Sequence, residues 1–169
     1  TFELATRSEQ LQAEVDTRRQ AEERLQRAVG ELHRMAMSDG LTQLANRVAL
    51  TEHLTMQWAA LARTGREMAL MLVDVDHFKK YNDHYGHMGG DSVLRTVAQC
   101  LSDAARYPLD LACRFGGEEF VLVLPDTSVV AAEFVAERFR ASLAKVAIPH
   151  VASPVASILT VSIGIAVAR

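Results

Sequence analysis

The segment Arg114–Leu124 constrains the fold of this chain more than any other stretch. Two largely apolar runs, Leu111–Phe115 and Phe120–Leu124, flank the pair Gly116-Gly117. Runs of this kind favour β-strands, and the glycine pair between them suits a tight turn, because glycine takes positive φ without steric cost. We therefore predict an antiparallel hairpin that turns at Gly116-Gly117.

Two adjacent carboxylates, Glu118 and Glu119, directly follow this predicted turn. A segment that forms strands so readily gains no stability from paired negative charge at its tip. The pair is explained if a positive group, such as a metal ion, binds there. By itself the pair indicates a cation site without identifying the cation.

Length, composition and charge exclude several classes of protein. A chain of 169 residues, 49% hydrophobic and 23% charged, suffices for one globular domain with an appendage. Its net charge of −3 argues against a nucleic-acid polymer as partner. Cys100 and Cys113 have neither metal-ligand spacing nor a disulfide framework, so we expect a cytoplasmic protein. We find no membrane-spanning run and no signal peptide, and the absence of an initial Met suggests a fragment of a longer protein.

The first 36 residues differ in character from the rest of the chain. They contain no Pro, one Gly, and many Glu, Arg, Gln and Ala residues. Alternating steps of four and three residues select a mostly apolar seam, which predicts a long helix that forms a parallel coiled-coil dimer. A solvated single-helix linker is the alternative. The seam consists of Leu4, Ser8, Leu11, Val15, Arg18, Glu22, Leu25, Val29, Leu32 and Ala36.

From Asp39 onward the pattern predicts a mixed α/β domain, in which helices pack on one or both faces of a sheet. We therefore divide the chain into residues 1–36, a coiled-coil helix, and a domain over residues 37–169. The domain's predicted elements are a helix over 45–63, a strand over 68–75, helices over 77–84 and 91–106, the hairpin, a helix over 129–145 and a strand over 158–167.

Asp74 and Asp76 lie at the end of the strand predicted over 68–75. Side chains alternate along a strand, so both carboxylates share one side. If this strand pairs beside the hairpin, Asp74 approaches Glu118 or Glu119, and the carboxylates repel one another unless a cation neutralises them. Such oxygen ligands suit Mg²⁺ and recur in phosphoryl and nucleotidyl transfer. We interpret Asp76 as the N-cap of the next helix, whereas an unpaired charge at Asp74 has no structural use in an apolar strand.

Five motifs in this order resemble the GGDEF-domain diguanylate cyclases, here in a GGEEF variant. The resemblance covers residues 39–169. It implies a palm-like sheet of the nucleotidyl cyclase and ferredoxin-like kind, and the condensation of two GTP into cyclic di-GMP with release of two pyrophosphates. The motifs are DGLTQLANR at 39–47, DVDHFKKYND at 74–83, Gly86-His87 with Gly90-Asp91, RFGGEEF at 114–120, and TVSIG at 160–164.

The resemblance also implies metal ligands. Asp74, the backbone carbonyl of Val75 and Glu118 would hold Mg²⁺, with Mn²⁺ as an alternative. Glu119 would serve a second metal. Glu118 is also the candidate acceptor for the proton of the attacking 3′-hydroxyl. The glycine pair of the hairpin would let the backbone approach the nucleotide closely.

Four further positions match the family's nucleotide site. Asn82 and Asp91 correspond to its guanine-recognising pair, and their side chains can satisfy the guanine edge. An N-cap role for Asp91 is an alternative that does not exclude this one. His87 corresponds to a position near the substrate. Lys79 corresponds to one that faces the phosphates, and a solvated surface charge explains it equally well.

The implied reaction joins two GTP molecules, each held by one domain, so it needs two half-sites that face each other. A homodimer formed through the coiled coil would supply that geometry and raise the effective concentration of the second half-site. We therefore expect GTP and a second copy of the chain as partners, together with an upstream sensor or receiver domain.

Two features depart from the family pattern. Many members carry Arg-x-x-Asp before the hairpin, where product binds and inhibits. This chain keeps Asp110 there and has Tyr107 in place of the arginine, while Arg138 matches a secondary arginine. We expect weak or absent product inhibition. Members also continue into a phosphate-contacting helix, so we expect that the C-terminal end of the domain is missing after Arg169. A silent GTP- or cyclic di-GMP-binding module is therefore the alternative function, and a purely structural coiled-coil protein leaves the acidic residues unexplained.

Overall fold

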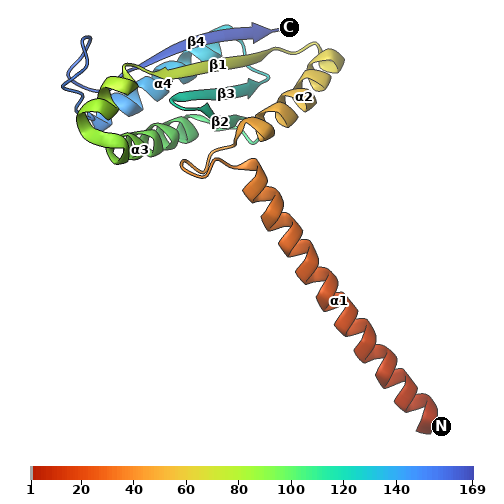
Figure 1. The fold of residues 1–169 in the computed structure, drawn as a ribbon. Helices are drawn as coiled ribbons and strands as arrows, with labels where there is room; N and C mark the ends of the chain where they lie inside the picture. The colour runs from red at the N-terminus through yellow and green to blue at the C-terminus, as the bar shows by residue number, and fades with distance from the viewer. Residues whose placement is uncertain (1) are drawn as a thin grey trace. The chain divides into compact units, whose positions relative to one another are not determined.

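A computed structural model describes residues 2–169 of the chain, including the side chains of residues 12, 14–33 and 35–169 (Figure 1). The chain divides into two compact units, Thr1–Ala36 and Met37–Arg169. The elements, in chain order, are α1 (Phe2–Met37), α2 (Arg47–Thr64), β1 (Met68–Val75), α3 (Phe78–Ala104), β2 (Leu111–Gly116), β3 (Glu119–Pro125), α4 (Val129–Val146) and β4 (Val161–Ala168).

The apolar seam residues of helix α1 whose side chains the structure describes are exposed, whereas Leu4, Ser8 and Leu11 of the seam lie outside the described side chains. Leu25 and Leu32 are 64% and 65% exposed, and Val29 is 56% exposed. The polar interruption of the seam is an ion pair along the helix, in which Arg18 Nε lies 3.2 Å from Glu22 Oε1. A helix with an exposed apolar stripe gains stability when that stripe is covered. Among the described residues, no helix is long and apolar enough to cross a membrane.

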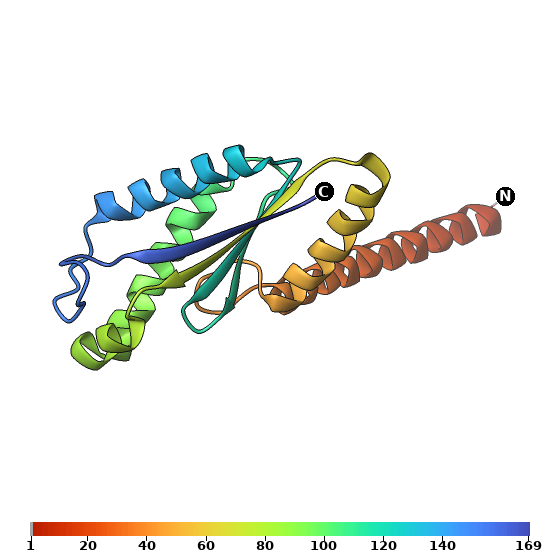
Figure 2. The ribbon, with the colours of Figure 1, turned by 90° about the horizontal axis from the view of Figure 1, so that it is seen from above.

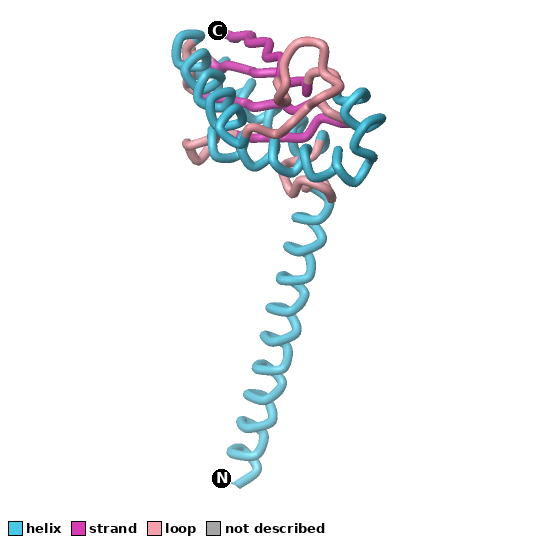
Figure 3. Tube along the Cα trace, turned by 90° about the vertical axis from the view of Figure 1, so that its left-hand side faces the viewer, coloured by secondary structure: helices cyan, strands magenta, loops and turns pink. Residues whose placement is uncertain are grey.

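The strands of the second unit form a four-stranded antiparallel sheet in the order β2-β3-β1-β4 (Figure 3). Helices α3 and α4 cover one face of this sheet, and α2 covers part of the other (Figure 2). The predicted mixed α/β class is confirmed. The core beneath α3 and α4 includes Met71, Val73, Val97, Phe120, Leu122 and Phe139, whereas the core beneath α2 includes Leu50, Leu61, Cys113, Val121 and Val123.

The hairpin turns one residue later than predicted. Gly116 belongs to β2 and pairs with Glu119, so the turn consists of Gly117, with φ of 54°, and Glu118. The pairing is irregular between Arg114 and Gly116, and this irregularity shifts the turn along the chain. Glu118 is therefore a turn residue, while Glu119 is the first residue of β3.

The two helices predicted over 77–84 and 91–106 are one element, α3, which is kinked at Gly86. Gly86 takes φ 79° and ψ 163°, a conformation open to glycine but outside the helical region. Asp91 lies inside the second half of α3, so the N-cap interpretation of Asp91 is wrong. The N-cap interpretation of Asp76 is also wrong, because His77 occupies that position with φ of 57° and makes no side-chain cap.

Helix α2 begins at Arg47 because Asn46 caps it, accepting hydrogen bonds from the backbone N–H groups of Val48 and Ala49. Ala45, which the sequence pattern assigned to this helix, instead pairs with β2. Its N–H donates to Ala112 O at 3.2 Å, and its carbonyl accepts from Arg114 N–H at 2.9 Å. The segment that follows α1 is thereby attached to the hairpin strand.

Candidate active site

Acidic side chains lie at one end of the sheet, on the face that α2 covers only in part. Asp74 on β1 lies opposite Glu119 on β3, and directly opposite residues of an antiparallel pair share a face. The backbone N–H of Val75 donates to the carbonyl of Glu118 at 3.4 Å, which attaches the hairpin turn to the end of β1. The fold thus brings Asp74 close to both glutamates.

The electrostatics of this end of the sheet favour a cation. Partial burial, and then the negative charges of Glu118, Glu119 and Asp76, raise the pKa of Asp74 above its ordinary value. A divalent cation between these groups would oppose that effect. Among the described residues, no group of three or more His, Cys, Asp and Glu side chains is preassembled around a point. One or two carboxylates with a backbone carbonyl fit Mg²⁺, which keeps waters and binds substrate phosphates.

Asp76 contributes charge to this site while its oxygens are occupied elsewhere. Its Oδ2 accepts a hydrogen bond from the Thr160 hydroxyl at 2.6 Å, and its Oδ1 accepts one from the Ser162 hydroxyl at 2.6 Å. Short bonds from hydroxyls to a carboxylate are strong. They join the end of β1 to the beginning of β4 and hold Asp76 toward that strand.

Arg114 holds the hairpin turn and was missed as a functional candidate by sequence reasoning. Its Nε and Nη2 donate to the carbonyl of Gly117 at 3.0 and 2.8 Å, and its Nη1 donates to Asp39 at 3.2 Å. Burial acts to raise the pKa of Asp39, but hydrogen bonds from Thr42 and Arg114 outweigh it, so this pKa lies below its ordinary value. The available signal was an arginine inside an otherwise apolar strand.

Asn82 and Asp91 come from the two halves of α3, which the kink at Gly86 folds against each other. Asn82 Oδ1 is buried and has no hydrogen-bond partner among the described residues. A Cβ atom on Gly90 would lie 1.9 Å from this oxygen, so only glycine at position 90 leaves room for Asn82. Asp91, the next residue, is exposed. The arrangement offers a buried amide oxygen and an exposed carboxylate from the two halves of α3.

Lys79 and His87 are exposed on α3. Lys79 lies in the first turn of the helix, one residue after Phe78, and His87 follows the kink directly. The structure gives neither side chain a role in the core. Both side chains are therefore accessible to a ligand, but exposure alone does not distinguish them from ordinary surface residues.

The residues that correspond to the expected product site make internal hydrogen bonds, but Asp110 Oδ1 and Arg138 Nε are buried without a partner among the described residues. Asp110 Oδ2 accepts hydrogen bonds from the N–H groups of Arg106 and Tyr107, each at 3.0 Å. Arg138 Nη2 donates to the carbonyl of Ala104. Tyr107 is 73% exposed. These residues border a hollow of about 860 Å³. Arg138 bonds to the last residue of α3, whereas Asp110 bonds to the loop that follows the helix.

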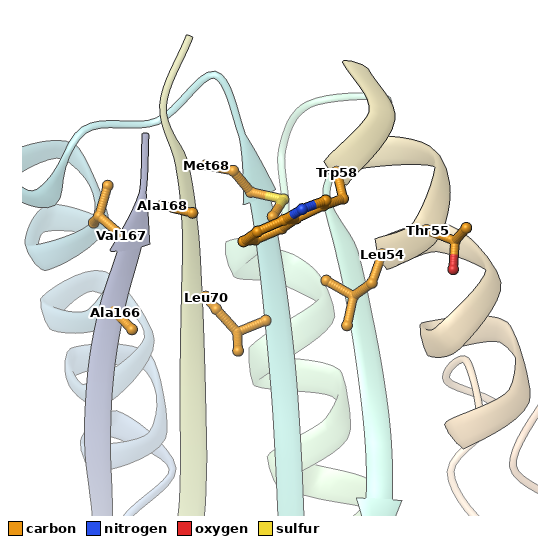
Figure 4. A pocket seen from close by; sticks show the side chains of 8 residues that line it. All are labelled: Leu54, Thr55, Trp58, Met68, Leu70, Ala166, Val167 and Ala168. Atoms are coloured by element: carbon orange, nitrogen blue, oxygen red, sulfur yellow. The ribbon is translucent and has the colours of Figure 1, made fainter. Parts of the chain in front are cut away.

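A second hollow, of about 610 Å³, lies between α2 and the strands β1 and β4 (Figure 4). Trp58 reaches from α2 over Met68, and Leu54 and Leu70 lie on either side. Its lining is apolar except for Thr55. Since a nucleotide phosphate needs polar or cationic partners, this hollow does not suit the charged part of a nucleotide.

Comparisons with known proteins agree with the motifs. Residues 36–169 match the family model described as "Diguanylate cyclase, GGDEF domain". Diguanylate cyclase DgcP of Pseudomonas aeruginosa is 39% identical over 142 residues, which cover 84% of this chain and 21% of that protein. Diguanylate cyclase DgcM of Escherichia coli is 43% identical over 139 residues, covering 80% of this chain and 32% of that protein. The chain thus spans about a fifth to a third of these two relatives.

Among solved structures, the coiled coil and GGDEF domain of DgcB from Caulobacter crescentus, in complex with c-di-GMP, superimposes with a TM-score of 0.82. It is 31% identical, and the match covers 94% of this chain and 83% of that one. The match of residues 36–169 to the family model, with relatives of 39% and 43% identity, confirms the resemblance read from the motifs. The chain belongs to the GGDEF domain family of diguanylate cyclases.

Proposed function

We propose that this chain condenses two GTP molecules into cyclic di-GMP and two pyrophosphates, with each half of the active site supplied by one copy. The observation that carries the proposal is the gathering of Asp74, Glu118 and Glu119 beside a glycine turn at one end of the sheet. Repulsion among these carboxylates is relieved by a cation, and a nucleotide triphosphate supplies further oxygen ligands to such a cation. Relatives named as diguanylate cyclases support the assignment.

In this proposal Asp74, the Val75 carbonyl and Glu118 would hold Mg²⁺ or Mn²⁺, and Glu119 would serve a second ion. A divalent ion held there would lower the pKa of the attacking hydroxyl and neutralise charge on the phosphates. Glu118 accepts the proton of the 3′-hydroxyl of one GTP. The 3′-oxygen of that GTP then forms a bond to the α-phosphorus of the second GTP. The bond from that phosphorus to pyrophosphate breaks, and pyrophosphate leaves.

Base recognition falls to the two halves of α3. Asn82 and Asp91 have the donors and acceptors that the edge of guanine requires. Lys79 would face the phosphates, and His87 would lie near the nucleotide. Gly116 and Gly117 carry no side chains, so the backbone of these two residues can approach the substrate.

Replacing Gly90 with alanine tests this base site. The new methyl group would displace the Asn82 amide, so we expect GTP affinity to fall about tenfold, which corresponds to the loss of one or two hydrogen bonds. The stability should fall by about 1–3 kcal/mol, because the methyl group would also lie 3.1 Å from Cζ of the buried Phe78. Equilibrium titration with 3′-deoxy-GTP, which lacks the attacking hydroxyl, would measure the affinity.

Gly89→Ala is the matched control for this change. Its added methyl group would lie 3.1 Å from the Cβ atom of Tyr85 and 3.8 Å from Tyr81 Cε1, so it crowds the same half of α3 without contacting Asn82 directly. Equal affinity losses in the two variants would contradict a specific role for Asn82 and indicate a general disturbance of α3.

The second half-site would come from another copy of the chain. The exposed apolar stripe of α1, which includes Leu25, Val29 and Leu32, suits a parallel coiled coil with its twin. We accordingly propose residues 1–36 as a dimerising and signalling helix and residues 37–169 as the cyclase domain. A sensor or receiver domain upstream would act through this helix. Because the substrate is an intracellular nucleotide, we propose a cytoplasmic location.

We also expect cyclic di-GMP to inhibit the reaction weakly or not at all through the site formed by Tyr107, Asp110 and Arg138. Tyr107 lacks a guanidinium group, Asp110 bonds to the loop after α3, and Arg138 bonds to the last residue of that helix. Initial rates should therefore stay nearly constant as product is added. Asp110→Ala should lower stability by about 1 kcal/mol through loss of its backbone hydrogen bonds, without changing that response. A stoichiometric product complex that Asp110→Ala abolishes would contradict this expectation.

The decisive assay is incubation of the chain with GTP and Mg²⁺, followed by separation of the nucleotides and detection of pyrophosphate. The proposal requires cyclic di-GMP and two pyrophosphates per product, both lost when EDTA is added. Binding of GTP without turnover would instead identify the chain as a silent nucleotide-binding module.

A further inference from the structure

His150 is fully buried, in the loop of residues 147–160 that joins α4 to β4. Histidine is polar, and a buried polar ring needs partners. The loop fixes its backbone: His150 N–H donates to Ser157 O at 2.9 Å, and its carbonyl accepts from Ser153 N–H at 3.1 Å. The loop therefore holds the ring at one place in the interior.

The ring meets the beginning of α3. His150 Nε2 lies 3.3 Å from the carbonyl oxygen of His77, and since a carbonyl only accepts, Nε2 must carry the hydrogen. The same carbonyl accepts the first hydrogen bond of α3, from Tyr81 N–H at 3.1 Å. His77 has φ of 57°, which is unfavourable for a residue with a side chain. His150 thus supports a strained corner at the point where α3 begins.

The contact continues along α3. The rings of His150 and Tyr81 meet edge to face with their centroids 5.1 Å apart, and the ring centroids of Tyr81 and Tyr85 are 4.5 Å apart. The Tyr85 hydroxyl in turn accepts a hydrogen bond from Val151 N–H at 3.3 Å. The loop is therefore attached to the first half of α3 at both ends of a row of three rings.

The first half of α3 carries Asn82, one residue after Tyr81 and packed against Gly90. We propose that His150 is a positioning residue for nucleotide recognition: by holding His77 and Tyr81 it fixes the orientation of Asn82. This inference rests on the proposed function, in which Asn82 contacts guanine. His150 itself does not touch the substrate.

The test compares two replacements of His150 in the whole chain. His150→Phe keeps a ring but removes the donor, whereas His150→Gln can place an amide N–H near the position of Nε2. Titration with 3′-deoxy-GTP and Mg²⁺ should show affinity about fivefold lower for the phenylalanine variant, the effect of one hydrogen bond, and nearly restored for the glutamine variant. The preference for 3′-deoxy-GTP over 3′-deoxy-ATP should also fall in His150→Phe and be nearly restored in His150→Gln. A purely structural role would not change this preference.

Two further variants make the outcome decisive. Val155→Ala, at an exposed position of the same loop, should leave affinity unchanged. Asn82→Ala should lose affinity, and adding His150→Phe to it should cost no more, because the histidine acts through Asn82. If Asn82→Ala loses affinity while His150→Phe keeps both affinity and base preference, the positioning role is wrong and the proposed function stands.

If Asn82→Ala itself binds 3′-deoxy-GTP as well as the parent chain, the proposed guanine site fails, and the role of His150 fails with it. Should His150→Phe not show a cooperative thermal transition, Tyr85→Phe replaces it. That variant removes the hydroxyl that accepts from Val151, and the inference requires lower affinity and weaker base preference from it too. Unchanged binding in Tyr85→Phe would then overturn the inference.

Discussion

Glu118→Ala is expected to reduce the formation of cyclic di-GMP from GTP about a thousandfold or more. Under the proposed mechanism Glu118 both holds the cation and accepts the proton of the 3′-hydroxyl, and each role contributes several kcal/mol to the transition state. The backbone of Glu118 also accepts a hydrogen bond from Val75, but that bond does not depend on the side chain. The fold should therefore survive. Pyrophosphate release at saturating GTP and Mg²⁺ is the measurement.

Glu52→Ala provides the matched control, because Glu52 is an exposed residue on α2. It should keep the parent activity. Glu118→Gln, which retains the shape but not the charge, should be as inactive as Glu118→Ala. Substantial cyclic di-GMP from either Glu118 variant, with an unchanged thermal transition, would show that the carboxylates at this end of the sheet do not carry the reaction.

Placing two charges in the seam of α1 is expected to remove most activity at low protein concentration. Leu25→Glu with Val29→Glu would oppose association of two helices, since their partners in a parallel dimer are the same residues. A tethered second half-site has an effective concentration near the millimolar range, so at about 1 μM protein the loss should reach about a hundredfold or more. Specific activity measured across protein concentration would show it.

The parent chain should have a specific activity independent of concentration, whereas that of the variant should rise with concentration. Gln12→Glu with Gln20→Glu adds the same charge outside the seam and should behave like the parent. Sedimentation velocity would report the oligomeric state of each protein. Full activity of the seam variant, or of a chain lacking residues 1–36, at submicromolar concentration would contradict the role given to the coiled coil.

Much of the domain could be predicted because its patterns are local. The apolar run at Met68–Val75 has the bounds of β1, and residues 129–145 differ from α4 only at the last residue. The approach of Asp74 to Glu119 also followed from sequence, because alternation along a strand and one pairing decision suffice to place both side chains on one face. The two elements depend on residues close together in the chain, and the approach of Asp74 to Glu119 needs one strand pairing in addition.

The errors share a different cause. Asp76 resembles an N-cap, but its partners are Thr160 and Ser162, more than eighty residues away. The hairpin turns at Gly117-Glu118 because its pairing is irregular, and cross-strand register is invisible in one strand. By contrast, the break predicted between two helices lies at Gly86, whose backbone is not helical, and α3 continues across it as one kinked element.

The sequence by itself determined the order of the elements, the acidic positions beside the glycine pair and the family. Those features depend on residue type and periodicity within short segments, so the amino-acid sequence contains them directly. Only the tertiary structure decided that Arg114 holds the turn through Gly117 and that His150 supports the beginning of α3. Both are contacts with backbone carbonyls. Any residue type can supply a backbone carbonyl. The pattern of side chains therefore does not predict which carbonyl an arginine or a distant histidine will contact.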